Sequence, residues 1–298
     1  MDQNQNAFKF YLLHEKKYSL HTINAYNRDI DNFASFLTSE HQENDFTKVT
    51  YNHIRGWIVS LVNNGVKPIS VNRKISALKT FYRFLIKSKQ IQYSPLAKHT
   101  SLKMGKRIEI PFSQDEVKNV LTHGGFNENF EDVRNKLIID LFYSTGIRRM
   151  ELIDLEVGNV DLVGHSIKVL GKRNKERIIP LLPTIVADIV NYLDKRSDLE
   201  IINDAKLLFL TNSGNKLNIS LVYRLVNKYF STVTEKVKKS PHILRHSFAT
   251  HLVNNDADLN AIKELLGHAT LASTQVYTHN SLSELKRAHG LAHPRQKK

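Results

Sequence analysis

The chain has no cysteine among its 298 residues, no apolar run of membrane-spanning length and too few acidic residues to balance its basic ones. The missing thiols exclude disulfides, thiolate catalysis and thiolate–zinc sites. No apolar run approaches the roughly 20 residues that span a bilayer, and the start Met-Asp-Gln-Asn-Gln-Asn lacks a signal peptide's basic and apolar regions. These absences predict a cytoplasmic protein with no membrane partner.

The charge is strongly one-sided, with 43 Lys and Arg against 29 Asp and Glu, a formal net charge of +14. Such an excess indicates a polyanionic partner, and nucleic acid is the better choice once a membrane is set aside. We therefore expect the protein to associate with the DNA of the nucleoid. The length is sufficient for two domains, each with its own core.

Residues 1–93 predict an all-helical first domain. The expected helices are a short one over 6–15, a longer one capped by Ser19, a third opened by Thr50 and a fourth opened by Ser70. Four helices with short loops are typical of a small bundle.

Residues 94–112 are basic, weakly periodic and bracketed by prolines, so they predict an interdomain linker. A capping box at Ser113–Glu116 would open a mixed second domain over 113–298. Two short strands, 166–170 and 177–181, are expected to form a hairpin around the loop 171–175. Helices are expected at 131–143, 148–156, 183–196, 219–230, 244–255, 258–266 and 271–279. The predicted fold class is mainly α: a two-domain clamp with a small antiparallel sheet in the second domain.

Histidines, arginines and a tyrosine gather in the second half without paired carboxylates. His242 and Arg245 precede Gly267-His268 and Tyr277, and Arg148 lies upstream. Guanidinium groups bind phosphate oxygens through paired N–H donors, and a tyrosine hydroxyl can attack phosphorus. The pattern predicts an enzyme that cuts and rejoins DNA strands without a metal.

Five motifs, by order and spacing, resemble the tyrosine recombinase (phage integrase) family, specifically its short Xer-type members. They are Thr145-Gly-Ile-Arg148 with Glu151-Leu152, Gly171-Lys172 with Asn174-Lys-Glu-Arg177, Pro241-His-Ile-Leu-Arg245-His-Ser-Phe-Ala-Thr-His251, Leu265-Leu-Gly-His268, and Gln275-Val-Tyr277-Thr-His279. The resemblance runs nearly end to end and implies a SAM-like core-binding first domain. Arg173, in place of the hairpin's second glycine, and Arg149-Met150 depart from the family pattern.

The resemblance implies a phosphate clamp. Arg148 and Arg245 would neutralise the charge that builds on the phosphate in the transition state, a task that other enzymes give to magnesium. His268 would help to hold the same phosphate. No cofactor or metal is then expected.

The resemblance also assigns the covalent step. Tyr277 would be the nucleophile, and His242 the general base that takes its proton. Lys172 would protonate the departing 5′ oxygen. The product would be a 3′-phosphotyrosyl link that preserves the phosphodiester energy, so religation would need no ATP.

Each residue taken singly has an ordinary interpretation. Arg148 alone suits a surface ion pair, Lys172 a solvated loop, and Tyr277 a core position; only the joint pattern favours catalysis. The 14 histidines include no His-Glu-x-x-His motif, which argues against zinc. His246 and His251 are predicted to be structural.

A second set of polar and basic residues predicts contacts with DNA phosphates or bases, although a solvated face is the ordinary alternative. These residues are Thr22, Asn24, Asn27, Arg73, Lys74, Lys79, Arg83, Lys103, Lys106, Arg107 and Arg173.

The Xer resemblance implies four protomers on two copies of a specific double-stranded DNA site, either identical or paired with a paralogue. It implies resolution of chromosome dimers at cell division, with a DNA translocase as activator. The amphipathic segment Leu282–Leu291 is predicted to dock on a neighbouring protomer. Integration or inversion of a mobile element, relaxation of supercoils in the manner of a type IB topoisomerase, and DNA binding without catalysis stay as alternatives.

Overall fold

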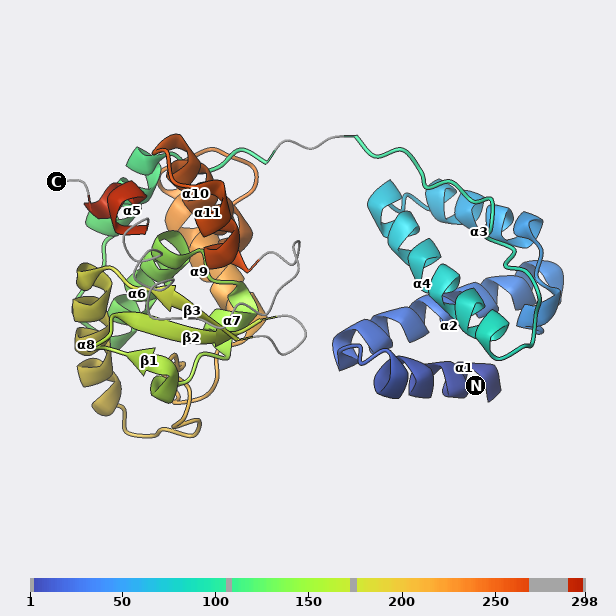
Figure 1. Ribbon diagram of the computed structural model, residues 1–298, viewed down its shortest axis with the longest axis horizontal. Helices are drawn as coiled ribbons and strands as arrows, with labels where there is room; N and C mark the ends of the chain where they lie inside the picture. The colour runs from blue at the N-terminus through green and yellow to red at the C-terminus, as the bar shows by residue number, and fades with distance from the viewer. Residues whose placement is uncertain (1–2, 106–108, 172–175, 268–288, 297–298) are drawn as a thin grey trace. The chain divides into compact units, whose positions relative to one another are not determined.

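The structure, a computed structural model, describes residues 3–105, 109–171, 176–267 and 289–296. The chain divides into two compact units, Met1–Arg107 and Ile108–Lys298. Helices predominate in both units, and a small sheet lies in the second (Figure 1). The predicted class, mainly α with a small antiparallel sheet, is confirmed.

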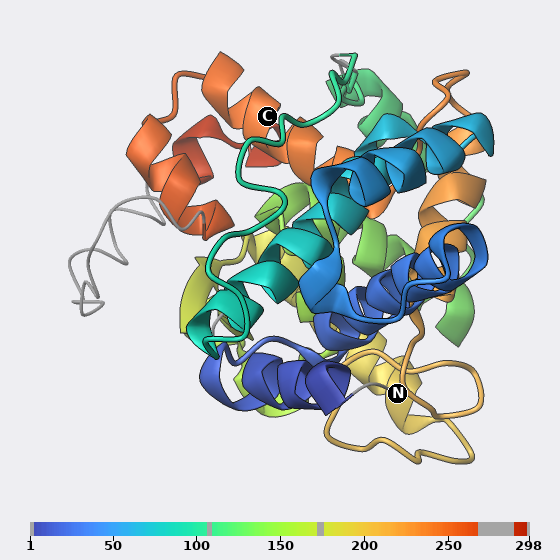
Figure 2. The same ribbon diagram turned by 90° about the vertical axis from the view of Figure 1, so that its right-hand side faces the viewer.

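The first unit is helical throughout its regular elements. They are α1 (Gln3–Phe10), the π-helical turn η1 (Tyr11–Glu15), α2 (Leu20–His41), the 3-10 turn η2 (Phe46–Lys48), α3 (Tyr51–Asn63) and α4 (Pro68–Lys87). Helices α2, α3 and α4 pack against one another. They can be followed in Figure 2 by their blue to cyan colours. Their apolar sides enclose a core that includes Phe33, Trp57 and Phe81.

The helix starts follow local capping chemistry. Ser19 caps α2 by accepting the backbone N–H of Thr22 at 3.3 Å, and Thr50 stands at the N-cap of α3, as predicted. Helix α4 begins at Pro68 rather than at Ser70. A proline suits the first helical position because its φ is already helical and the N–H that it lacks would have no partner there.

A buried carboxylate joins α2 to α4. Asp29 is fully buried; it accepts hydrogen bonds from both terminal nitrogens of Arg73 and, at 3.0 Å, from the Lys74 ammonium. A charge without solvent is tolerated only when it is paired and hydrogen-bonded. Two of the basic residues predicted to contact DNA are therefore bound to the core of their own unit.

The segment 94–112 is attached to both units rather than free of them. In the first unit the Asn72 side chain holds the Leu102 backbone through two hydrogen bonds, at 2.9 and 3.0 Å. In the second, Phe112 is fully buried and its N–H donates to the Ser247 hydroxyl at 2.8 Å. The described part of the segment is therefore anchored at Leu102 in the first unit and at Phe112 in the second.

The second unit places helices around a three-stranded antiparallel sheet of order β1-β2-β3 (Figure 1). Its elements are α5 (Gln114–His123), α6 (Phe130–Thr145), α7 (Arg149–Ile153), η3 (Val157–Asn159), β1 (Val160–Asp161), β2 (Ser166–Leu170), β3 (Glu176–Pro180), α8 (Pro183–Ser197), α9 (Ile219–Ser231), α10 (Pro241–Asn254), α11 (Leu259–Leu266) and η5 (Pro294–Gln296). Helix α6 is buried along most of its length and packs against α8 and α10. The helix predicted at 271–279 lies outside the described residues.

Most predicted boundaries in this unit are close to those observed. The capping box at the start of α5 is confirmed: Ser113 accepts the Glu116 N–H at 3.1 Å, and the Glu116 carboxylate accepts the Ser113 N–H at 2.7 Å. Helix α10 begins at Pro241 rather than at residue 244, again with proline at the first position. Helix α7 ends at Ile153, earlier than predicted.

The end of the chain packs on its own unit. His289 and His293 are buried, with Nε2 atoms 2.6 Å from the Ser144 carbonyl and 3.3 Å from the Tyr143 carbonyl. Ala292 belongs to the second unit's core, whereas Leu291 is 70% exposed. Docking of Leu282–Leu291 on a neighbour stays a prediction, but truncation after residue 280 would also remove core side chains.

Candidate active site

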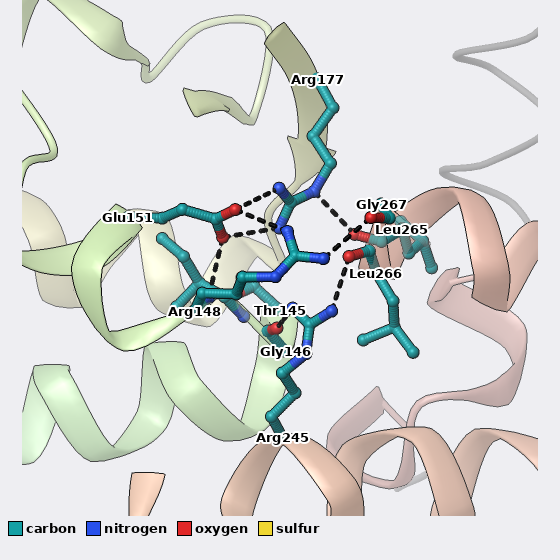
Figure 3. A network of polar contacts seen from close by, with 10 residues as sticks. Thr145, Gly146, Arg148, Glu151, Arg177, Arg245, Leu265, Leu266 and Gly267 are labelled. Atoms are coloured by element: carbon teal, nitrogen blue, oxygen red, sulfur yellow. Dashed lines mark hydrogen bonds and ion pairs between the residues drawn. The ribbon is translucent and has the colours of Figure 1, made fainter. Parts of the chain in front are cut away.

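Two of the predicted phosphate-binding arginines meet in one network (Figure 3). Arg148, at the N-cap of α7, donates from Nη1 to Glu151 at 2.7 Å and from Nη2 to the Gly267 carbonyl at 2.8 Å. Arg245, on α10, donates to the Gly146 carbonyl and, at 2.6 Å, to the Leu266 carbonyl. Residues separated by about a hundred positions are thus brought side by side.

A third arginine completes the network. Arg177, on β3, donates through two terminal nitrogens to the two Glu151 oxygens at 2.6 and 2.8 Å, and its Nε donates to the Leu265 carbonyl at 3.0 Å. The sequence identifies Arg177 only as part of a family motif and does not predict it as a site residue. Nothing local distinguishes it from an ordinary strand arginine, and only the position of its motif indicated its importance.

The end of α11 is held by all three arginines. The carbonyls of Leu265, Leu266 and Gly267 each accept one guanidinium bond, and these are among the carbonyls that a helix leaves without an internal partner. Gly267 ends the helix with φ +62°, and a Cβ there would lie 3.0 Å from Cδ of Arg177. Glycine is required by both its conformation and this close approach. The next residue is His268, which lies outside the described residues.

The network carries more positive than negative charge. Burial opposes ionisation of Glu151, but the hydrogen bonds and charge of Arg177, with bonds from Arg148, lower its pKa to about 2. Burial, together with the nearby charges of Arg148 and Arg177, lowers the pKa of Arg245 to about 9. One carboxylate therefore faces three guanidinium groups. Such a desolvated excess of cation favours binding of an anion.

His242 lies in the first turn of α10, three residues before Arg245. Its side chain is 73% exposed, and its Nε2 is 3.6 Å from the Glu109 carboxylate. Lys238 also binds Glu109. This hydrogen bond, together with the electrostatic effects of Lys238, His242 and His246, lowers the pKa of Glu109 against the opposing effect of partial burial. The predicted general base is therefore accessible and stands beside an acidic neighbour.

Of the remaining residues singled out in the sequence, some are not described by the structure, and two histidines differ in burial. Lys172, Arg173 and Tyr277, like His268, lie outside the described residues. His251 is buried and its Nδ1 lies 2.9 Å from the Tyr143 hydroxyl, in line with a structural role. His246 is exposed, so the structural prediction for it is wrong; it points away from the buried side of α10.

Models of two sequence families match the chain: the phage integrase family over residues 111–284, and the phage integrase N-terminal SAM-like domain over residues 6–89. The chain belongs to the phage integrase family. Among curated members, this integrase-family chain is 33% identical to the tyrosine recombinase XerC of Chlorobaculum tepidum, over 97% of this chain and 93% of that protein. It is 33% identical to the tyrosine recombinase XerD of Staphylococcus aureus, over 94% and 95%.

Solved structures of integrase-family proteins share the fold. The site-specific recombinase XerH, in a post-cleavage complex with a palindromic difH substrate, matches with a TM-score of 0.71 at 22% identity, over 95% of this chain and 83% of that one. The integrase of the transposon Tn1549, in complex with circular intermediate DNA, matches with a TM-score of 0.70 at 18% identity, over 94% and 98%. The sequence-based assignment to this family, and to its Xer-type branch, is confirmed.

The residues predicted to contact DNA in this integrase-family chain differ in exposure. Asn24, Arg83 and Lys103 are exposed; Thr22, Asn27 and Lys79 are half-buried; Lys106 and Arg107 lie outside the described residues. In the described part of the chain, no group of side chains is arranged to hold a metal ion. No helix described by the structure is long and apolar enough to cross a membrane.

Proposed function

We propose that this tyrosine recombinase, an enzyme of site-specific DNA recombination, cuts and rejoins DNA through Tyr277 with the scissile phosphate held by Arg148 and Arg245. The observation that carries the proposal is the desolvated excess of guanidinium charge around a single carboxylate. A phosphodiester anion would supply the missing negative charge, and its transition state would supply more. The site then binds the transition state more tightly than the substrate, which is the condition for a faster reaction.

The remaining steps follow the residues' chemistry and family roles. His242, exposed on α10, would accept the Tyr277 proton as the hydroxyl attacks phosphorus. The P–O bond to the 5′ oxygen breaks, Lys172 protonates that oxygen, and a 3′-phosphotyrosyl link remains. His268, which follows the arginine-bound end of α11, would contact the same phosphate. Attack by a 5′-hydroxyl of another strand reverses these steps and releases the tyrosine.

The decisive test is a nicked suicide DNA substrate carrying a dimer-resolution site, incubated with the full chain in EDTA. We expect a covalent protein–DNA adduct whose attachment maps to Tyr277 by peptide mass spectrometry. Tyr277→Phe is expected to form no adduct, whereas Tyr223→Phe, which alters an exposed tyrosine on α9, should match the wild type. An adduct on another residue, or one surviving in Tyr277→Phe, contradicts the proposal.

The biological substrate and assembly are part of the same proposal. Relatives named XerC and XerD support a site bound by this chain together with itself or a paralogue, in a tetramer on two DNA copies. Resolution of chromosome dimers, with a translocase as activator, is the role that we propose. Recombination between two sites in one plasmid, with and without a paralogue, measures this directly.

Arg83 offers a test of the first unit's DNA-binding face. Its side chain is exposed on α4, whereas Lys87, one turn further, already pairs with Glu15. We expect Arg83→Gln to make the negative slope of log binding constant against log salt shallower by about 1. The reason is that one fewer counterion is released when the variant binds DNA. Lys87→Gln is the matched control and should leave the slope within error. An unchanged slope in Arg83→Gln would remove this residue from the interface.

A further inference from the structure

Arg177 is the most completely engaged side chain of the arginine network. Only 5% of its side chain is exposed, against 28% for Arg148. Its Nε and both terminal nitrogens donate to acceptors in the same unit. A guanidinium has five N–H donors in a fixed fork; three of those of Arg177 bond protein acceptors, and the side chain presents almost no surface to solvent. Direct contact with DNA is therefore not its role.

The acceptors of Arg177 are the supports of the two other arginines. Glu151, which it grips with two bonds, also accepts the Nη1 of Arg148 and, at 2.8 Å, the Arg148 backbone N–H. The Leu265 carbonyl, which it bonds through Nε, directly precedes the carbonyl that orients Arg245. One side chain thus connects β3, α7 and the end of α11 (Figure 3).

We propose that Arg177 is a positioning residue, which fixes the forks of Arg148 and Arg245 in the orientation that binds the scissile phosphate. The inference rests on the proposed function, since it concerns the same phosphate site. It assigns to Arg177 a role in anion binding and in the rate of strand cleavage without contact with the substrate. It also places the residue before His268 under the control of the same contacts, because Gly267 packs on the Arg177 side chain.

Lysine is the informative replacement. It preserves the positive charge but ends in a single ammonium, which cannot reach both Glu151 oxygens and the Leu265 carbonyl in the fork geometry. Arg134→Lys is the matched control in the same unit. Arg134 is also buried, and its guanidinium bonds the Leu210 carbonyl and the Asn212 side chain at 3.0 Å, away from the network.

The experiment measures three quantities for the full-length wild type and both variants, each corrected for the folded fraction from near-ultraviolet circular dichroism. They are the single-turnover cleavage rate at saturating suicide substrate, the DNA concentration giving half that rate, and the dissociation constant for inorganic phosphate. For Arg177→Lys we expect cleavage to slow about 10- to 100-fold, half-saturation to change less than about 3-fold, and phosphate affinity to fall about 5-fold or more. Arg134→Lys should change none of these beyond about 2-fold, even where it lowers stability.

The outcomes separate this inference from the proposed function. If the wild type cleaves DNA and Arg177→Lys matches it in rate and phosphate affinity, only the positioning role is overturned. The same holds if Arg134→Lys loses as much cleavage rate and phosphate affinity as Arg177→Lys. Without any wild-type adduct the proposed function fails, and phosphate affinity still decides whether Arg177 orients an anion site. Should Arg177→Lys not fold, Gly267→Ala tests the same contact: its methyl group would press on Cδ of Arg177, and we expect slower cleavage with DNA half-saturation unchanged. Wild-type cleavage and phosphate affinity in Gly267→Ala would contradict the proposal.

Discussion

Arg245→Lys is expected to slow strand cleavage by about 10³-fold or more, while DNA binding by the full chain changes little. Arg245 is 8% exposed, and its two terminal nitrogens already bind the Gly146 and Leu266 carbonyls, which fix the orientation of its guanidinium. A lysine cannot hold both carbonyls and a phosphate oxygen, because its ammonium is a point charge without the planar fork.

The electrostatic surroundings make the lysine variant worse still. Burial and the charges of Arg148 and Arg177 lower the pKa of Arg245 to about 9, and the same surroundings would push a lysine, which starts at about 10.4, toward neutrality. We therefore expect the residual activity of Arg245→Lys to rise as pH is lowered from 9 to 6 relative to wild type. Single-turnover cleavage of the suicide substrate across this range measures both effects. A loss below about 10-fold, or equal pH profiles, would contradict the assigned role.

Glu151→Gln is expected to lower the unfolding free energy of the second unit by about 3 kcal/mol at pH 7. The carboxylate side chain is 5% exposed and accepts bonds from two arginines. Its pKa falls from 4.5 to about 2 on folding, and each unit of pKa corresponds to about 1.4 kcal/mol. Removing the charge leaves the guanidinium groups of Arg148 and Arg177 without their shared carboxylate partner.

The pH dependence of this effect follows from the direction of the shift. A carboxylate with a lowered folded pKa stabilises fully above its unfolded pKa, near 4.5, and this contribution is lost as pH falls through about 2. The stability difference between wild type and Glu151→Gln should therefore be constant above pH 5 and shrink below 4.5. Urea unfolding followed by near-ultraviolet circular dichroism measures it.

Two internal controls accompany this measurement. The single tryptophan, Trp57, is buried in the first unit, so its fluorescence transition should be unchanged in Glu151→Gln. Glu200→Gln, which alters an exposed carboxylate of the second unit, should change stability by less than about 0.5 kcal/mol. A pH-independent difference, or a shifted Trp57 transition, would mean that the substitution acts by another route.

Local signals in the sequence were sufficient for most helices and for the family. Apolar periodicity is visible within a single helix, and the capping residues Ser19, Thr50 and Ser113 directly precede the helices that they begin. At Pro68 and Pro241 the helix begins before the residue that apolar periodicity predicts. In both helices proline is the first residue, and an apolar pattern does not register proline as a helix initiator. The motifs around Arg148 and Arg245 indicate phosphate chemistry because they occur together, in the order and spacing of the family's motifs.

What the sequence by itself determined is which residue types are present, in which order, and which short segments are helical. The tertiary structure alone decided that Arg177 shares Glu151 with Arg148, that three arginines hold the end of α11, and that Asp29 binds Arg73 and Lys74. Apart from the bond between Arg148 and Glu151, these contacts join residues 21 to 119 positions apart. No local rule predicts them, because they depend on how whole elements pack, and packing sets the partner, the burial and hence the charge state of each group.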